Sequence, residues 1–449
     1  MTLLDPLFGD PETDALLGDA TYVAAILKVE VALARAEAKA GVIPAHAVEA
    51  IAAAADASTF DLPALGAAAA RAGNLAIPLV HQLTERVARL DAESARYVHW
   101  GATSQDVLDT ALVVQLRDAA RVILARLAQA GDSAALLAER HGDTVMPGRT
   151  WLQHATPVTF GLKAAGWMAA LDRARERIHD ALERALVLQL GGASGTLASL
   201  GDRGAEVAQG MAWELWLTVP ELPWHSHRDR LASLACALGV AAGTMGKIAR
   251  DVSLLGQTEI GEAFEPSGDG RGGSSTMPHK RNPVGTSVVL GAAVRAPALV
   301  ATMLAALPQE HERGLGGWQA EWETMPALVH VTAGAARHIA EMLEGLEVDA
   351  ERMRSNADIT GGVSLAESVS MALAAHIGKA EAHRLIESAS RLALTEHRSL
   401  ADVLEGMPEV TRHLTAAEIA RCLTAERYLG STARFLRAAQ AEHGESRKR

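Results

Sequence analysis

The chain has 449 residues, which is enough for a large hydrophobic core and for two or three domains. Apolar residues make up 49% of it and aromatic residues only 4%, so its apolar content is mostly Ala, Leu and Val, which favour close-packed helices. The net charge is −12 and no basic stripe is present, which argues against a nucleic-acid partner.

The predicted elements are helices almost throughout. In the first hundred residues, an amphipathic helix over residues 21–39 is stopped by Gly41 and Pro44, and shorter helices follow over residues 61–90. Strand-like alternation is scarce everywhere in the chain. We therefore expect an all-α fold.

A long helix is predicted over residues 104–140. Ser104 can serve as its N-cap, and Asp106 lies in its first turn, where a carboxylate suits the helix dipole. A loop over residues 142–148 ends this helix, and the next helix is predicted over residues 157–188.

Three more long helices are predicted over residues 229–262, 284–309 and 317–346. Their apolar positions often cover more than one face, so each helix needs partners on several sides. The simplest solution is a central bundle that subunits share. Residues 361–449 return to short helices and a charged tail.

The two cysteines, Cys236 and Cys422, lie in apolar helical patterns and are expected to be reduced core residues rather than a disulfide or a metal pair. We recognise no signal peptide and no apolar run long enough to span a bilayer. These features predict a cytoplasmic protein without a membrane partner.

A polar loop rich in glycine lies between two of the long helices, and its residues 272–283 read Gly-Gly-Ser-Ser-Thr-Met-Pro-His-Lys-Arg-Asn-Pro. A flexible polar loop between stiff helices is a typical place for chemistry. The spacing resembles the signature loop of the fumarase/aspartase superfamily, Gly-Ser-Ser-x-Met-Pro-x-Lys-x-Asn-Pro. The positions in register are Ser274, Ser275, Met277, Pro278, Lys280, Asn282 and Pro283.

This resemblance covers essentially the whole chain and implies the architecture of the superfamily. The expected parts are a small N-terminal helical domain over residues 1–105, a central long-helix domain over residues 106–360 and a small C-terminal helical domain over residues 361–449. The expected assembly is a homotetramer whose central domains form one bundle and whose active sites are shared between subunits. No cofactor or metal is expected.

By the same resemblance, Ser274 is the group that takes or delivers the carbon-bound proton, and Ser275 is the alternative proton carrier. A serine hydroxyl alone is too weak a base, so Lys280 and loop N–H groups have to stabilise its anion. Lys280 and Asn282 are also expected to hold the carboxylate next to the reacting carbon, where charge concentrates in a dianionic intermediate.

A second segment that matches the superfamily is His99-Trp-Gly-Ala-Thr-Ser-Gln-Asp. Thr103 and Ser104 lie at the start of a long helix, where hydroxyls and free backbone N–H groups make a natural carboxylate site. Taken alone, the segment also fits a simple N-cap. His99 is expected to line the pocket, together with Met277 and His279 of the polar loop.

The third segment is Gly148-Arg-Thr-Trp-Leu-Gln-His-Ala-Thr-Pro157. Superfamily enzymes usually carry Thr-His here, and that His helps the leaving group to depart, but this chain has Trp151. Hydroxide and amine leaving groups benefit from a proton donor, whereas a carboxylate, whose parent acid has a pKa of roughly 4, needs none. Thr150 and Gln153 are further binding candidates. His154, about one turn from Trp151 if the segment is helical, is an alternative proton donor.

The missing His suggests chemistry in which the leaving group is itself a carboxylate. The chain also resembles the 3-carboxy-cis,cis-muconate cycloisomerase family, in residues 148–167, 190–197, 224–230 and 309–323. The resemblance implies that a carboxylate of a small tricarboxylate adds to a C=C bond and closes 4-carboxymuconolactone, a step of protocatechuate breakdown. The cations available to such a substrate are Arg149, Arg228, Arg230, Arg281 and Arg313.

Three alternatives stay open. Adenylosuccinate lyases resemble this chain up to Glu312-Arg313, but glycines and tryptophans then replace the residues that hold a nucleotide phosphate, which favours a small unphosphorylated substrate. A cycloisomerase for another 3-substituted muconate, such as the sulfonate analogue, makes similar demands on a basic pocket. A non-catalytic structural relative, like the eye-lens crystallins related to argininosuccinate lyase, could lose Ser274 or Lys280, yet both are present.

Overall fold

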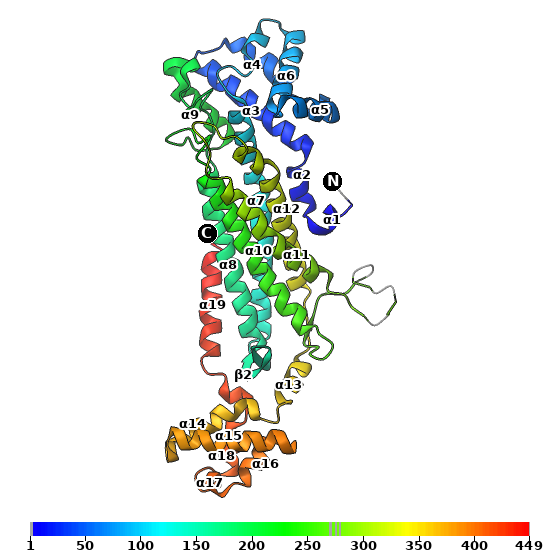
Figure 1. Cartoon of the computed structure of the whole chain (residues 1–449), viewed down its shortest axis with the longest axis vertical. Coiled ribbons are helices and arrows are strands. Elements are labelled where there is room, and N and C mark those ends of the chain that lie inside the picture. Colours follow the sequence, from blue (N-terminus) through cyan, green and yellow to red (C-terminus); the bar gives the residue numbers. More distant parts are fainter. Residues whose placement is uncertain (1–2, 269–271, 274–275, 278–279, 449) are drawn as a thin grey trace. The chain divides into compact units, whose positions relative to one another are not determined.

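The structure is a computed structural model that describes residues 3–268, 272–273, 276–277 and 280–448 (Figure 1). Helices dominate it, so the predicted all-α class is confirmed. The chain divides into two compact units: the first contains residues 1–127, 174–246 and 288–337, and the second contains residues 128–173, 247–287 and 338–449. The boundaries fall inside the five longest helices, so each of these contributes residues to both units.

These five helices are the long ones expected from the sequence, with ends that differ by a few residues. Their bounds are α7 (Ser104–Arg140), α8 (Phe160–Ala185), α10 (Asp229–Leu255), α11 (Val284–Ala305) and α12 (Gly317–Glu344). Within the first unit, α10 and α11 pack closely, because a Cβ on Gly239 of α10 would come within 2.6 Å of Val300 of α11.

The rest of the first unit consists of shorter helices, most of which pack around one hydrophobic core. Helix α3 carries Ile26 and Leu33 into this core and packs against α9, where Gly210 lies close to Ala36. The bounds are α1 (Asp5–Phe8), α2 (Pro11–Leu16), α3 (Asp19–Lys39), α4 (Ala45–Ala54), α5 (Leu62–Ala72), α6 (Ala76–Leu90) and α9 (Gly204–Leu215), with 3-10 turns η1 (Ala57–Thr59), η2 (Ser94–Tyr97) and η3 (Ala198–Arg203).

The second unit combines a β-hairpin with the C-terminal helices. Val369, Leu373 and Leu404 belong to one of its hydrophobic cores, and Thr415 and Glu418 form a capping box at the start of α18. The bounds are β1 (Val145–Thr150), β2 (Gln153–Thr159), β3 (Ala263–Phe264), β4 (Glu347–Val348), α13 (Ala350–Asp358), η4 (Val363–Leu365), α14 (Ala366–Ile377), α15 (Lys379–Glu396), α16 (Leu400–Glu405), α17 (Pro408–Thr411), α18 (Ala416–Cys422), η5 (Ala425–Tyr428) and α19 (Thr432–Ser446).

Two expectations about the elements are corrected. Residues 157–159 are not helical, because β2 pairs antiparallel with β1 and α8 begins only at Phe160. By length and composition, α10 and α11 are also apolar enough to cross a bilayer, contrary to the expectation that no such run exists. In α10, 61% of the apolar window is buried, as is usual in the core helix of a globular protein, whereas in α11 only 28% is buried.

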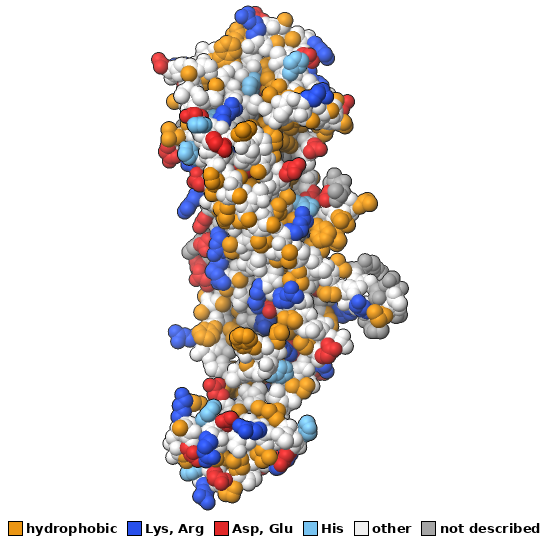
Figure 2. All heavy atoms as spheres, viewed as in Figure 1, with side chains coloured by type: hydrophobic (Ala, Val, Ile, Leu, Met, Phe, Trp, Pro, Cys, Tyr) orange, Lys and Arg blue, Asp and Glu red, His pale blue; other side chains and the backbone are white. Residues whose placement is uncertain are grey.

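The surface seen in Figure 2 carries many apolar side chains between the charged ones. On α11, Val294 is among the most exposed large apolar residues, and Leu304 is also exposed. Cys236 and Cys422 are both free, so the absence of a disulfide between them is confirmed, although both are only partly buried.

Candidate active site

The first predicted segment lies at the start of α7 in the first unit. Asp106 lies three residues after Thr103, and its carboxylate accepts a hydrogen bond from the Thr103 backbone N–H at 2.9 Å. This is one half of a capping box, with Thr103 in the N-cap position. Ser104 is then the first helical residue and not the predicted N-cap. Thr103 and Ser104 are both half-buried, so the hydroxyl of each can meet a ligand.

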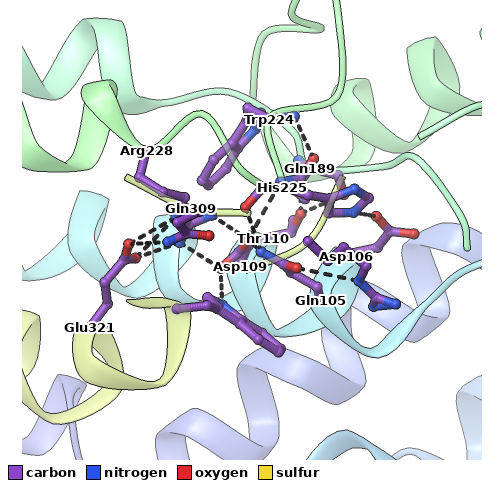
Figure 3. Close-up of polar contacts among 12 residues, drawn as sticks. Gln105, Asp106, Asp109, Thr110, Gln189, Trp224, His225, Arg228, Gln309 and Glu321 are labelled. Atoms are coloured by element: carbon purple, nitrogen blue, oxygen red, sulfur yellow. Dashed lines mark hydrogen bonds and ion pairs between the residues drawn. The ribbon is translucent and has the colours of Figure 1, made fainter. Parts of the chain in front are cut away.

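Asp106 holds three distant segments together, a role that its place in the first helical turn did not reveal. Its fully buried carboxylate accepts hydrogen bonds from the backbone N–H groups of Gly191 and Gly192, each at 2.9 Å. His225 Nε2 lies 2.7 Å from the same carboxylate (Figure 3). Residue 191 has to be glycine, because a Cβ there would come within 2.7 Å of the His225 ring. This glycine is the feature of the sequence that points to the close contact.

A buried cluster of charged side chains surrounds Arg228 and includes Asp109, in the second turn of α7. The Arg228 guanidinium donates to Asp109 at 2.6 Å and to Glu321 at 2.6 Å, and it lies 4.6 Å from the centre of the Trp224 ring (Figure 3). Burial lowers the pKa of Arg228, but the two carboxylates outweigh burial and raise it. Arg228 is 1% exposed, so it supports the fold and is not available to a substrate.

Four of the five candidate arginines are held by carboxylates of this chain. Within the described residues, Arg313 is the member of this set that contacts no carboxylate: it donates to Thr103 Oγ1 at 2.6 Å and lies 3.5 Å from Gln105 Oε1. The paired arginines are Arg149 with Glu262, Arg228 with Asp109 and Glu321, Arg230 with Glu221, and Arg281 with Glu347.

The start of α7 therefore has the features of an anion site. It combines the Thr103 and Ser104 hydroxyls with the Arg313 guanidinium at a helix N-terminus. His99 lies four residues before Thr103, and its pKa is raised by carboxylates that outweigh its burial. The structure thus brings His99, Thr103, Ser104 and Arg313 into one region of the first unit.

The second predicted segment is the turn of the β1–β2 hairpin, in the second unit. Thr150 pairs with Gln153, which leaves Trp151 and Leu152 as a two-residue loop. Both loop residues have positive φ, 53° and 64°, the pattern of a type I′ turn that normally takes Asn and Gly. Trp151 is 95% exposed and Leu152 is 81% exposed. A strained turn that presents an indole to solvent makes Trp151 a candidate functional residue.

The idea that His154 lies one helical turn from Trp151 is wrong, because this segment is a strand. His154 lies opposite Arg149 in the hairpin, and its buried Nδ1 has no hydrogen-bond partner within the described chain. Burial and the charge of Arg149 lower the pKa of His154, so the ring is kept neutral. A neutral imidazole is a poor proton donor, which weakens His154 as a substitute acid.

A buried ion pair fixes the hairpin next to its turn, at the pair of residues Arg149 and His154. Both oxygens of Glu262 accept from Arg149, at 2.8 Å and 2.6 Å, and one also accepts from Asn356 at 2.7 Å. Glu262 is fully buried, so this bidentate pair fixes the direction of the strand that leads to Trp151.

The third predicted segment is the polar loop of the second unit. Ser274, Ser275 and His279 lie outside the described residues. Lys280 is exposed, and its backbone N–H donates to the carbonyl of Met277, which is partly exposed.

Hydrogen bonds from Asn282 hold the end of the polar loop against its start. Asn282 donates from its backbone N–H to Gly272 O at 2.8 Å, and its side chain lies 3.3 Å from Gly273 O. Arg281 contacts Glu347 at 2.7 Å, and Glu265 accepts from the Gly285 N–H at the start of α11 at 3.0 Å. Arg281 is therefore engaged in holding the loop, next to the exposed Lys280.

The structure does not join the hairpin turn to the loop. Among the described residues of the second unit, no hydrogen bond or ion pair connects Thr150, Trp151, Gln153 or His154 with Lys280 or Asn282. The exposed turn and the exposed lysine each present functional groups to a ligand or to another surface.

Comparison with known proteins gives consistent matches along the chain. The model of the lyase family matches residues 7–298, and that of the adenylosuccinate lyase C-terminus matches residues 362–439. The 3-carboxy-cis,cis-muconate cycloisomerase of Bradyrhizobium diazoefficiens is 54% identical over 96% of this chain and 95% of its own length. The enzyme of the same name from Pseudomonas aeruginosa is 53% identical over 98% of this chain and 96% of its own length.

A solved structure gives the same match at the level of the fold. The crystal structure of 3-carboxy-cis,cis-muconate lactonizing enzyme from Pseudomonas putida has a TM-score of 0.94 and 49% sequence identity. The match covers 99% of this chain and 99% of that one, so the likeness is not confined to a single domain.

Proposed function

Since the chain belongs to the lyase family, within its group of 3-carboxy-cis,cis-muconate cycloisomerases, we propose that it converts 3-carboxy-cis,cis-muconate to 4-carboxymuconolactone. One carboxylate of the substrate forms a C–O bond to a carbon of the conjugated diene, and a proton is added to the neighbouring carbon. The product is an isomer of the protonated substrate, so the step needs no oxidant or reductant.

The observation that carries this proposal is Trp151 at the turn of the hairpin. An indole N–H donates a hydrogen bond but does not act as a general acid near neutral pH. In the direction of lactone opening, the departing oxygen becomes a carboxylate, whose parent acid has a pKa of about 4, so no acid is required. A C–N or C–OH lyase would gain from a proton donor at this place.

The substrate carboxylates have two candidate holding points. One is the anion site of Thr103, Ser104, Arg313 and His99 at the start of α7, which offers hydroxyls, backbone dipoles and a guanidinium. The other is the polar loop, where Lys280 with Asn282 would hold the carboxylate next to the carbon that gains the proton. Charge accumulates on that carboxylate in the dianionic intermediate, so a cation there lowers the barrier most.

Ser274 is our proposed proton carrier, with Ser275 as the alternative, and both assignments rest on the match to the superfamily loop. The remaining proposed binding residues contact the substrate from the hairpin and the loop: Thr150, Trp151, Gln153, His154, Met277 and His279. Of these, His154 acts as a hydrogen-bonding group and not as an acid, in line with its lowered pKa.

We further propose a cytoplasmic homotetramer in which each active site takes residues from different subunits, with the three-domain division given above. The exposed turn of Trp151 and Leu152 and the poorly buried apolar helix α11 support this assembly, because each leaves an apolar surface for another chain.

The test is an assay of the purified protein with 3-carboxy-cis,cis-muconate. The diene absorbance should disappear, and mass spectrometry and NMR should identify the lactone. Adenylosuccinate and the 3-sulfonate analogue serve as competing substrates under the same conditions. A folded protein that leaves the diene unchanged, or that acts best on adenylosuccinate, would refute the proposal.

A further inference from the structure

A buried carboxylate of α3 contacts the histidine that precedes the anion site. Glu30 Oε1 lies 2.6 Å from His99 Nδ1, and Glu30 is 2% exposed. The two residues are 69 positions apart in the chain, so the contact exists only because α3 packs beside the segment leading into α7. Glu30 belongs to no sequence motif. Its place on the apolar face of a helix was the one feature that could have indicated a buried, partnered carboxylate.

This contact determines which nitrogen of His99 faces a ligand. A carboxylate only accepts hydrogen bonds, so Nδ1 of the ring has to carry a proton. The remaining nitrogen, Nε2, has no hydrogen-bond partner among the described residues. The His99 side chain is 19% exposed, so the ring is held from behind by Glu30 while part of it remains accessible.

The charges around His99 favour the imidazolium, in which Nε2 is also a donor. Burial lowers the pKa of His99, but the charge and hydrogen bond of Glu30 and the charge of Asp106 together outweigh burial and raise it. Glu30 approaches from α3 and Asp106 from α7, and these two carboxylates raise the pKa of the ring. An imidazolium next to Thr103 and Arg313 suits an anionic ligand.

A second buried acid on the same helix provides a natural comparison. Glu37 lies two turns after Glu30 and is fully buried, but neither of its carboxylate oxygens has a hydrogen-bond partner in the part of the chain that the structure describes. Burial and the nearby charge of Glu30 raise the pKa of Glu37 to about 9, so Glu37 is neutral near pH 7. Glu30 differs because it has a cationic partner.

We propose that Glu30 is a positioning residue for the reaction: its hydrogen bond to Nδ1 fixes the tautomer and direction of His99, so that Nε2 donates to a substrate carboxylate at the start of α7. This assignment rests on the proposed function for the identity of the substrate. The chemical class it predicts for this subsite is a carboxylate held by an imidazolium, two hydroxyls and a guanidinium.

The experiment compares Glu30→Gln with Glu37→Gln over a range of pH. The amide that replaces the Glu30 carboxylate can still accept a hydrogen bond from Nδ1 but carries no charge, so the pKa of His99 falls. His99 of the variant then loses its second proton at a lower pH than in the natural chain, and carboxylate binding weakens at that lower pH. The basic limb of the kcat/KM profile therefore moves down by about one pH unit or more. At pH 8 we expect KM to rise about tenfold with kcat nearly unchanged, the sign of lost ground-state binding. Glu37→Gln should leave the profile in place.

Binding of propane-1,2,3-tricarboxylate, measured calorimetrically at several pH values, gives a readout that does not depend on turnover. Its affinity for Glu30→Gln should fall at a lower pH than for the natural chain, and His99→Asn should remove the difference between them. An active Glu30→Gln enzyme with an unshifted pH profile and unshifted binding overturns the proposal. If the natural chain binds the tricarboxylate but does not convert 3-carboxymuconate, the proposed function fails while the Glu30–His99 pairing is still tested by binding.

Discussion

At the scale of single residues, Trp151 carries most of the chemical argument. Its exposure and its positive φ mean that the fold does not need an indole at this point for its own core. A residue that is strained and exposed is retained for what it contacts. Here that contact is proposed to be the substrate, where the ring fills space and excludes water without donating a proton.

The first prediction is that Trp151→His does not raise kcat for lactonisation. The carboxylate needs no acid, and the smaller ring leaves room for water, so we expect kcat to fall about tenfold, comparable to the discrimination that one methylene group provides in an apolar pocket. Trp151→Phe is the matched control, because it keeps an apolar ring. Steady-state kinetics with 3-carboxymuconate measure both variants, and a His variant several times faster than the natural enzyme would contradict the leaving-group argument.

The second prediction concerns Glu37, whose buried carboxylate has no hydrogen-bond partner among the residues that the structure describes. Its pKa is raised from 4.5 to about 9 in the folded chain. Below pH 4.5 the acid is protonated in both states; as the pH rises toward 9, the unfolded chain releases the proton and the folded chain does not, so stability falls across this window.

The glutamine of the Glu37→Gln variant cannot ionise, so the variant should be more stable than the natural chain at pH 8, by on the order of 5 kcal/mol in the free energy of unfolding. The gain should shrink to near zero at pH 4.5. Denaturant unfolding at a series of pH values measures it, with the exposed Glu49→Gln as control. A gain that does not depend on pH would show that Glu37 is not protonated in the native state.

At the scale of elements, the hairpin and the polar loop are each held by an ion pair, and the proposed functional residues Trp151 and Lys280 lie at exposed positions beside these pairs. Glu262 fixes the strand that leads to Trp151, and Glu347 fixes Arg281 next to Lys280. Arg281 is not a free cation, because its hydrogen bonds to Glu347 raise its pKa and keep it paired. Backbone segments held by ion pairs of this kind position side chains more accurately than free loops do.

The third prediction follows from the burial of Glu262. Glu262→Ala leaves Arg149 and Asn356 without their acceptor, and breaking a buried pair costs about 3 kcal/mol or more in the free energy of unfolding. Arg149→Met combined with Glu262→Leu should recover much of the loss, since no charge is then left unpaired. Denaturant titration of the single and double variants tests this, and a double variant no better than Glu262→Ala would contradict it.

At the scale of the whole molecule, the groups proposed for one reaction belong to different parts of the chain. The anion site is formed within the first unit, whereas the hairpin and the loop belong to the second. An assembly in which several chains contribute residues would supply all of them to one substrate, and the apolar surface of α11 is suited to that assembly.

The fourth prediction is that sites are rebuilt when two inactive variants are mixed. Ser274→Ala should lower kcat by at least about a hundredfold without changing the assembled mass, because it removes the proton carrier. Arg313→Ala should be inactive through loss of the anion site. If the sites are shared, subunit exchange between the two variants restores about a quarter of the natural activity, because a fraction of sites then receives both intact residues.

Light scattering and activity assays before and after subunit exchange measure this effect. An active monomer, or mixed oligomers that stay inactive after demonstrated exchange, would contradict the shared site.

Much of the fold and of the candidate site could be predicted from the sequence. The long helices followed from apolar periodicity, and Thr103, Trp151 and Lys280 followed from short motifs, because both signals depend on residues that are neighbours in the chain. Where local signals were weak, prediction failed: Thr150 to Gln153 form a hairpin turn without glycine or asparagine, so the usual marker of such a turn was missing.

The sequence by itself determined the family, the all-α class and the residue types available for the chemistry. Only the tertiary structure decided which arginines are held by carboxylates, that Asp106 joins three distant segments, and that Glu30 lies behind His99. The physical reason is that periodicity reports which face of a helix is buried but not which distant group faces it, whereas an ion pair or hydrogen bond forms only within about 3 Å. The state of charge of a side chain is therefore a property of the folded chain.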